Sequence, residues 1–149
     1  MVAISDSLTW QIISQNNSKM FKVSGTTKRT GCMRFSKEAG NVKSVHSHKY
    51  SGLANKKVVD VSVDSTGERP VISFSTKSTK ADQVSKSLAT VPLNKNVRSS
   101  VKTLEKQAVG NYYRNDLKQA TLAKFAGLYN ATRVAKGVKK GMAINTGRK

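Results

Sequence analysis

The chain has 149 residues and a formal net charge of +19, from 27 Lys and Arg against 8 Asp and Glu. A small domain needs a net charge of only about 2 to 8 for solubility, so this excess indicates a polyanionic partner and argues against a free soluble enzyme. Hydrophobic residues make up 37% of the sequence and aromatic residues 6%. This composition predicts one domain with a modest core and segments that order on a partner.

The basic residues are unevenly distributed along the chain. Residues 1–60 and 83–116 carry an excess of Lys and Arg, residues 61–82 are locally neutral, and residues 117–149 contain no acidic residue. We expect the neutral segment to face solvent and the basic segments to face phosphate groups.

The sequence provides little support for a metal site, an internal disulfide or a membrane-spanning segment. Cys32 is the single cysteine, and His46 and His48 are the two histidines. These are too few ligands for a structural zinc site, and we expect no cofactor. The N-terminus lacks a signal-peptide pattern and no window approaches roughly 18 apolar residues, so we expect a protein of the cytosol or nucleus.

The first element, within residues 5–14, has an ambiguous pattern. Ser5 or Asp6 can cap a short helix, whereas Leu8, Trp10 and Ile12 alternate as they would in a strand. Periodicity does not distinguish the two structures. In either structure we expect Trp10 to lie in the core rather than to serve as a stacking platform.

Two β-hairpins are predicted next. Residues 20–23 and 32–35 read as strands around a basic turn. Residues 36–56 show little periodicity, and we expect this loop, whose cations surround Tyr50, not to hold its conformation alone. Valines at every second position of 59–63, followed by Ile72 and Phe74, predict a hairpin with one buried and one solvated face.

A linker at residues 76–92, with one short strand near Leu88, precedes the first of two predicted C-terminal helices. Asn94 or Asn96 can cap this helix. Its apolar stripe, which ends before Gly110, consists of Val97, Val101, Leu104 and Ala108.

The second C-terminal helix is predicted to begin with Asn115 or Asp116 as its cap. Its broad apolar arc consists of Leu117, Leu122, Phe125, Leu128 and Tyr129, and its remaining face of Gln119, Lys124, Asn130 and Arg133. Residues 1–135 are therefore read as one domain and residues 136–149 as a basic tail with too little apolar surface to fold alone.

Catalytic motifs of the common enzyme classes are missing from the sequence: it has no phosphate-binding loop, GxGxxG, HExxH or GxSxG pattern. Cys32 with His46 or His48 is the one conceivable pair of nucleophile and base. A lone cysteine beside Met33 and Phe35 on a strand is more typical of a small core residue. We therefore expect no enzymatic activity, and we expect the two histidines to contact phosphate or solvent.

The basic surface, without any common DNA-reading or RNA-reading motif, favours a component of an RNA scaffold that recognises shape and phosphate. Tyr112 or Tyr113 can stack on unpaired bases while Arg114 reaches phosphate, although at least one of the tyrosines is expected to pack between the helices. The tail is then mobile unless RNA is bound. The candidate RNA-binding residues are Lys56, Lys57, Lys95, Arg98, Lys102, Tyr112, Arg114, Lys118, Arg133, Lys136, Lys139 and Lys140.

Five blocks of the sequence, in this order and spacing, resemble the eukaryotic large-subunit ribosomal protein twenty-eight, the "e" family. They are residues 8–13 (LTWQII), 35–38 (FSKE), 48–57 (HKYSGLANKK), 111–118 (NYYRNDLK) and 133–136 (RVAK). The resemblance spans about residues 8–140. Asn115 departs from the family pattern, which has proline there, but Asn can cap the helix that Pro would open.

The resemblance implies an α+β fold, with a small antiparallel sheet of hairpins packed with two C-terminal helices. It also implies a non-enzymatic constituent of the cytosolic large ribosomal subunit that contacts rRNA and neighbouring ribosomal proteins, passes through the nucleolus, and forms no homo-oligomer. The family shares its N-terminal part with a nucleolar ribosome-assembly factor, whose cysteines and acidic tail this chain lacks. The alternatives are such an assembly factor or a chromatin or DNA-binding protein.

Overall fold

The computed structural model of the chain describes residues 4–24, 31–65, 69–78 and 86–138. The fold is α+β, as the resemblance implied, and within these ranges no helix has the length and apolar character to cross a membrane. In chain order, the elements are α1 (Asp6–Gln15), β1 (Met20–Ser24), β2 (Cys32–Ser36), β3 (Val59–Asp64), β4 (Val71–Lys77), β5 (Leu88–Pro92), α2 (Val97–Glu105), η2 (Lys106–Gly110), η3 (Asn115–Leu117) and α3 (Lys118–Ala135).

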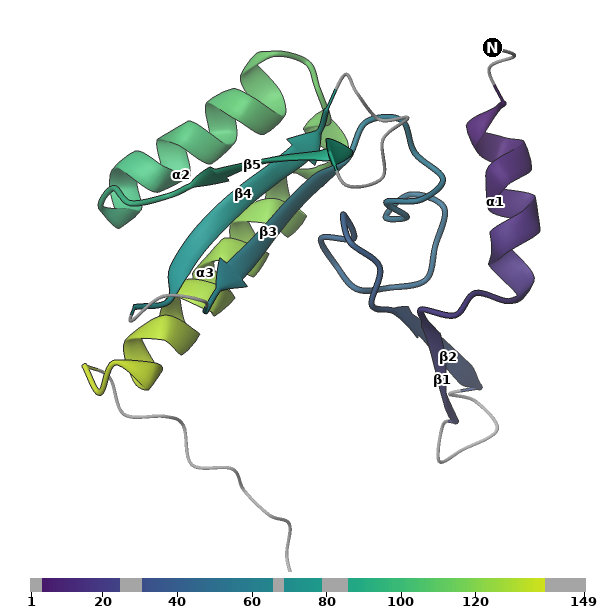
Figure 1. Cartoon of the computed structure of the whole chain (residues 1–149), viewed down its shortest axis with the longest axis horizontal. Coiled ribbons are helices and arrows are strands. Elements are labelled where there is room, and N and C mark those ends of the chain that lie inside the picture. Colours follow the sequence, from purple (N-terminus) through teal and green to yellow (C-terminus); the bar gives the residue numbers. More distant parts are fainter. Residues whose placement is uncertain (1–3, 25–30, 66–68, 79–85, 139–149) are drawn as a thin grey trace, which may run out of the picture.

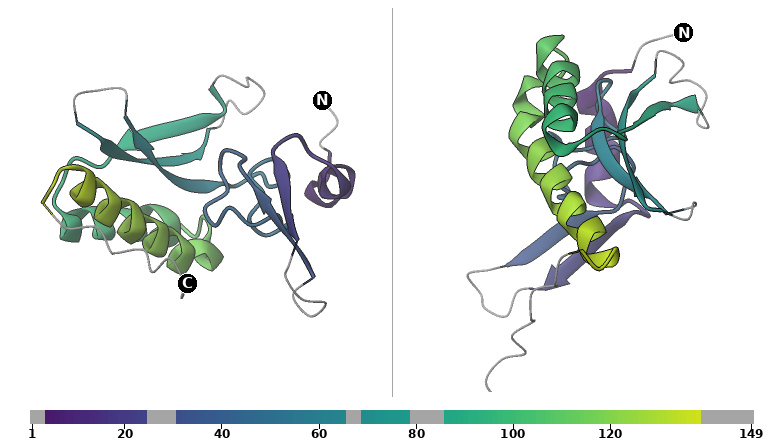
Figure 2. Two further views of the ribbon diagram at one scale, coloured as in Figure 1. Left: turned by 90° about the horizontal axis from the view of Figure 1, so that it is seen from below. Right: turned by 90° about the vertical axis from the view of Figure 1, so that its left-hand side faces the viewer.

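The larger sheet is antiparallel and has the strand order β3-β4-β5. Pairing of Val61 with Phe74 and of Val63 with Ile72 places the apolar side chains of β3 and β4 on one face. Helices α2 and α3 both lie on that side of the sheet (Figures 1 and 2). The predicted hairpin and its apolar face are confirmed, but its second face is not solvated along β4, where Ser73 and Ser75 are 1% and 6% exposed.

The core lies between this sheet face and the helices. Its buried residues are Val42, Val59, Val61, Ile72, Phe74, Leu104, Leu117 and Phe125. The expectation that the neutral segment 61–82 faces solvent was wrong, because β4 is buried from Ile72 to Ser75. Residues 71–76 carry no charge because β4 is the central strand of the sheet, where an unpaired charge would be costly.

The predicted apolar stripe of α2 is confirmed. Leu104 and Ala108 are about 1% exposed, and the side chain of Asn96 caps the helix by accepting a hydrogen bond from the Ser99 N–H. The predicted cap of α3 was wrong: a 3-10 turn precedes this helix, and no side chain caps it. Asp116 cannot serve as the cap because its carboxylate is bound by Arg114.

The N-terminal part lies at the other end of the molecule, where α1 and the β1–β2 hairpin are separate from the larger sheet (Figure 1). Residues 6–15 are helical, and Ser5 is the cap. Trp10 was expected in the core, but it lies outside the core cluster and packs on two histidine rings. Cys32 was expected to be a core residue, but it is exposed because the two-stranded sheet has no layer packed over it.

The region read as a linker contains the predicted strand near Leu88. It is β5, which pairs with β4 from Ser73 to Lys77 and forms an edge of the sheet. The division into a domain of 1–135 and a tail stays a prediction, since residues 79–85 and 139–149 lie outside the described ranges.

Candidate nucleic-acid interface

Arg114, at the junction of the two C-terminal helices, binds three separate points of the chain. Its Nη1 donates to the Lys57 carbonyl and its Nη2 to the Lys49 carbonyl, both at 2.8 Å. Its Nε and Nη2 also donate to the two carboxylate oxygens of Asp116, both at 2.9 Å. We call this arrangement the Arg114 clamp. It fixes the backbone of residues 36–57, the lysine-rich loop, against the junction of the two C-terminal helices.

The clamp also sets the charge state of Asp116. The hydrogen bond from the Arg114 guanidinium is the main reason that the pKa of Asp116 lies below its ordinary value of 3.8, and burial opposes the shift only partly. Asp116 therefore stays ionised, and the Arg114 side chain, only 14% exposed, has its charge compensated within the protein. Arg114 was predicted to reach phosphate, but these bonds make it part of the scaffold, and we leave it out of the phosphate-binding set.

Three lysines held by this loop lie over tyrosine rings. The ammonium groups of Lys43 and Lys49 are 5.5 and 5.8 Å from the centroid of Tyr50, and that of Lys57 is 5.7 Å from Tyr113. These distances are in the range of cation–π contacts, which orient a lysine while its head group stays accessible. The sequence predicted cations around Tyr50, and Lys43 and Lys49 are the two that lie there.

The two neighbouring tyrosines have different environments. Tyr113 packs against the core, and its hydroxyl accepts a hydrogen bond from the Val58 N–H at 3.2 Å. Tyr112 is 83% exposed and has a positive φ of 49°. One tyrosine is therefore internal, as expected, and Tyr112 is free to stack on a base.

A buried polar network supports the loop from below. Glu38, 5% exposed, accepts hydrogen bonds from the Asn41 amide at 3.1 Å and the Ser51 hydroxyl at 3.2 Å. The Asn41 amide also donates to the Val45 carbonyl at 2.9 Å. That residues 36–56 do not hold their conformation alone stays a prediction, because the Arg114 clamp also ties this loop to the rest of the chain. The internal network could not be foreseen, since periodicity does not reveal hydrogen bonds between polar side chains.

Two further contacts tie the loop to the sheet and to α3. Lys124 donates to Asp60 Oδ1 at 2.5 Å, and the second oxygen of Asp60 accepts from the Gly40 N–H at 3.2 Å. Gly40 and Gly52 lie so close that a Cβ on Gly52 would be 2.2 Å from the Ala39 carbonyl oxygen. Lys124, predicted on the outer face of its helix, is instead neutralised by an acid of the sheet.

Helix α2 presents a basic face on the outside of the molecule. Lys95, Arg98 and Lys102 are all exposed, and none has an acidic partner among the described residues. The apolar stripe on the opposite side of the helix packs into the core and so fixes the orientation of the three cations.

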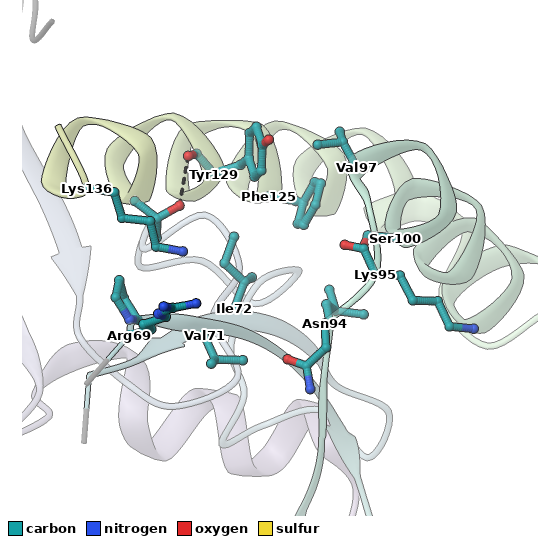
Figure 3. Close-up of a pocket in the computed structure, with 13 residues that line it drawn as sticks. Arg69, Val71, Ile72, Asn94, Lys95, Val97, Ser100, Phe125, Tyr129 and Lys136 are labelled. Carbon is teal, nitrogen blue, oxygen red and sulfur yellow. Dashed lines mark hydrogen bonds between the residues drawn. The ribbon is translucent and has the colours of Figure 1, made fainter. Parts of the chain in front are cut away.

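A third basic cluster lies where the end of α3 meets the start of β4. The Arg133 guanidinium lies 6.0 Å from the Tyr129 ring centroid, and Lys136 is exposed at the end of the helix. Arg69 lies opposite Lys136, and the two residues share a cavity lined also by Phe125 and Tyr129 (Figure 3).

The remaining predicted residues differ in how free they are. Lys56 forms a long ion pair with Asp6 at 3.9 Å, and Lys118 one with Glu105 at 3.2 Å. Both lysine side chains remain substantially exposed, at 68% and 45%. Lys139 and Lys140 lie outside the described residues.

The histidines do not assemble a catalytic pair with Cys32 in the described part of the chain. His46 Nε2 lies 3.0 Å from the Ser14 carbonyl oxygen. The Trp10 ring lies 4.9 Å from His46 and 5.6 Å from His48, measured between centroids. Both rings lie against Trp10 of α1. The expected contact with phosphate or solvent is wrong for the half-buried His46, whereas His48 is exposed to solvent. Within the described ranges, no group of three or more metal-binding side chains is present.

Comparison with known proteins decides the family. The model of the ribosomal L28e protein family matches residues 8–131. The chain belongs to this family. It is 41% identical over 120 residues to large ribosomal subunit protein eL28 of Caenorhabditis elegans, a match that covers 80% of this chain and 86% of the relative. It is also 33% identical to the Dictyostelium discoideum protein of that name, over 89% of this chain and 92% of the relative, and 27% identical to that of Schizosaccharomyces pombe, over 92% and 99%.

Sequence reasoning missed several residues of this L28e family member's basic surface. Lys43 and Lys49 were noticed near Tyr50 but not placed among the candidates. Arg69 was not among the candidates either, and no local pattern shows that it shares a cavity with Lys136, which lies 67 positions later in the chain. The two long-range bonds of the Arg114 clamp had no sequence signal either, because their acceptors are backbone carbonyls.

Proposed function

We propose that this protein is a structural constituent of the cytosolic large ribosomal subunit and binds rRNA mainly through phosphate contacts. Membership of the L28e family supports the assignment, as do the printed names of its relatives. Contact with neighbouring ribosomal proteins, passage through the nucleolus, a monomeric state and the lack of enzymatic activity belong to the same proposal.

The observation that carries the phosphate-binding role is the set of exposed cations without acidic partners. In a folded protein, a cation with no acidic neighbour is available to displace counterions from RNA, which is the main source of its affinity. Within the described residues, this set comprises Lys95 just before α2, Arg98 and Lys102 on α2, and Lys136 at the end of α3, with the half-buried Arg133 beside it.

The other members of the proposed interface have supporting roles. Lys56, Lys57 and Lys118 project from the loop and the helix junction, and Tyr112 offers an exposed ring for an unpaired base. Lys139 and Lys140 extend the basic stretch beyond α3 in the sequence. Because phosphate contacts carry no sequence information, recognition would depend on RNA shape.

The test is the salt dependence of binding to purified large-subunit rRNA. Replacing Lys95, Arg98 and Lys102 together with Gln removes three phosphate contacts. The slope of log K against log salt should become shallower by about 2 to 3 units, at about 0.7 to 0.9 per contact.

The matched control exchanges the same three residues for the other basic type: Lys95→Arg, Arg98→Lys and Lys102→Arg. The charge is then unchanged, and the slope should equal that of the natural protein. An unchanged slope in the Gln variant would show that this face of α2 does not bind phosphate.

Sedimentation of cell extracts distinguishes the alternatives. Co-migration with large subunits that survives moderate salt and is lost after RNase treatment supports the proposal. A fraction released by DNase supports a chromatin protein, and migration only with immature particles supports an assembly factor.

A further inference from the structure

A cavity of about 370 Å³ lies between the larger sheet and the two C-terminal helices. The start of β4, the segment after β5, the first turns of α2 and the second half of α3 form its walls (Figure 3). Its volume is at the lower end of the range of about 300–1,000 Å³ for ligand pockets. This size suits one nucleoside rather than a larger ligand. We call it the C-terminal cavity.

The interior of the C-terminal cavity is apolar and aromatic. Ile72 and Phe125 lie at its base and are 7% and 3% exposed, and Val97 and Tyr129 form its sides. The Tyr129 ring stacks on Phe125 with a centroid distance of 6.2 Å, which fixes the position of the tyrosine. Arg133 also lies over this ring, 6.0 Å from its centroid. A flat base that enters the cavity would therefore exchange water for contacts with the edge of Tyr129 and with the aliphatic side chains around it.

Polar groups within the cavity are suited to the edge of a base. Asn94 and the Ser100 hydroxyl line the cavity, and Ser100 already donates its proton to the Lys95 carbonyl at 3.2 Å. Its oxygen can therefore still accept a hydrogen bond. The Asn94 amide offers one acceptor and two donors.

Cations flank the cavity on two sides. Arg69 and Lys136 lie at one end and Lys95 at the other (Figure 3). Arg69 and Lys136 also line a second cavity of about 350 Å³, which continues the surface depression outward. Among the described residues, neither cavity is lined by Asp or Glu.

The other large cavities do not share this combination. The one beside the lysine-rich loop includes the ionised Asp116, and the one beneath β5 includes Glu38. Both of these cavities therefore include an acid in their lining. Within the described ranges, cations beside an aromatic lining without an acid are therefore found at the C-terminal end of the molecule.

We propose that the C-terminal cavity binds one unpaired nucleotide of an RNA strand, with its base inserted beside Tyr129 and its flanking phosphates on Arg69 and Lys136. The inference rests on the proposed function, since it assigns part of the RNA interface. It adds a site that recognises an extruded base, where the rest of the surface recognises only phosphate and shape.

The test uses two RNA hairpins that differ by one bulged nucleotide, a 2-aminopurine whose fluorescence falls when it stacks. The full-length protein should bind the bulged hairpin about tenfold more tightly than the fully paired one, and the fluorescence should fall on binding. Tyr129→Leu should remove most of this preference, and Tyr129→Phe should retain it, because the contact with the base needs the ring and not the hydroxyl.

A second pair of variants avoids any disturbance of the core. Arg69→Gln with Lys136→Gln changes two exposed residues and should weaken binding of the bulged hairpin more than that of the paired one. Lys102→Gln with Lys106→Gln, an equal loss of charge on the exposed side of α2, should weaken binding of both hairpins equally.

The possible outcomes separate the two proposals. Salt-dependent binding of both hairpins with equal affinity and unchanged fluorescence would overturn the nucleotide site while leaving the phosphate interface intact. Failure to bind either hairpin or rRNA would overturn both. Saturable binding of the free mononucleotide with equal affinity would show that the site serves a soluble nucleotide rather than an RNA strand.

Discussion

Arg114 shows how one side chain can hold distant parts of this chain together. Its replacement by Ala leaves the carbonyls of Lys49 and Lys57 without their donors and Asp116 without its partner. We expect Arg114→Ala to lower the free energy of unfolding by about 2 kcal/mol, measured by urea denaturation, since bonds to a charged group in a mostly buried position are lost.

The control for this prediction is Arg98→Ala, which removes an exposed arginine with no acidic partner among the described residues. It should change the unfolding free energy by less than about 0.5 kcal/mol. Equal effects of the two variants would mean that the clamp does not stabilise the fold.

The lowered pKa of Asp116 predicts a dependence of stability on pH. Because its folded pKa lies below the ordinary value of 3.8, the ionised form stabilises the folded state above that pH. This contribution is lost as the pH falls through the folded pKa. Asp116→Asn should therefore be less stable than the natural protein at pH 7, and the difference should shrink towards pH 2 in urea titrations. A constant difference would contradict this account.

The sequence identified Arg114 as a functional candidate but did not reveal its role. Its carbonyl acceptors lie 57 and 65 positions earlier in the chain. A backbone carbonyl has no residue signature, so only the tertiary structure reveals such a contact. Tyr113 was easier to interpret. Where two adjacent tyrosines lie beside an apolar helix, one of them is expected to pack in the core.

At the level of elements, the contact between Gly40 and Gly52 is the tightest crossing of two backbones around the loop. A Cβ at residue 52 would lie 2.2 Å from a carbonyl oxygen and 3.0 Å from the backbone of Gly40. Backbone atoms cannot move aside as a side chain can. We expect Gly52→Ala to destabilise the protein by about 1–3 kcal/mol, measured as a fall in the urea midpoint.

Gly127 offers the matched control for that substitution. It lies within α3, and a Cβ there would have no atom within 4 Å. Gly127→Ala should raise the stability by about 0.5–1 kcal/mol, because Ala has the higher helix propensity. If both variants were destabilised, a clash of the Cβ with the backbone would not be needed to explain the loss of stability at Gly52.

Elements with a local pattern could be predicted from sequence, and those held by tertiary contacts could not. The alternation in β3 and β4 and the stripe of α2 depend on burial of one face, which periodicity records. Residues 6–15 include no buried residue, so burial of one face has not produced a clear helical or strand periodicity there. The 36–56 loop depends on Glu38 and Asn41, whose burial has no periodic signal.

At the scale of the whole molecule, the surplus of positive charge should oppose folding at low ionic strength. Salt between about 0.01 and 0.1 M shortens the screening length from about 30 Å to about 10 Å. We expect the Tm, followed by circular dichroism, to rise over this range, by about 4 °C for each kcal/mol of repulsion removed. Glucose at equal osmolality should not reproduce the rise, and a flat or falling Tm would show that the cations are too far apart to repel.

The ion pairs among the described residues differ in how far solvent reaches them, and this difference bears on extraction. The pairs Lys56–Asp6 and Lys118–Glu105 are open to water, whereas Lys124–Asp60 has both side chains at least three-quarters covered. A concentrated salt wash that removes the protein from a ribonucleoprotein particle would weaken the two exposed ion pairs and leave the Lys124–Asp60 pair intact. Material recovered by such a wash should keep its sheet and last helix together, and the N-terminal helix should be the first part to detach.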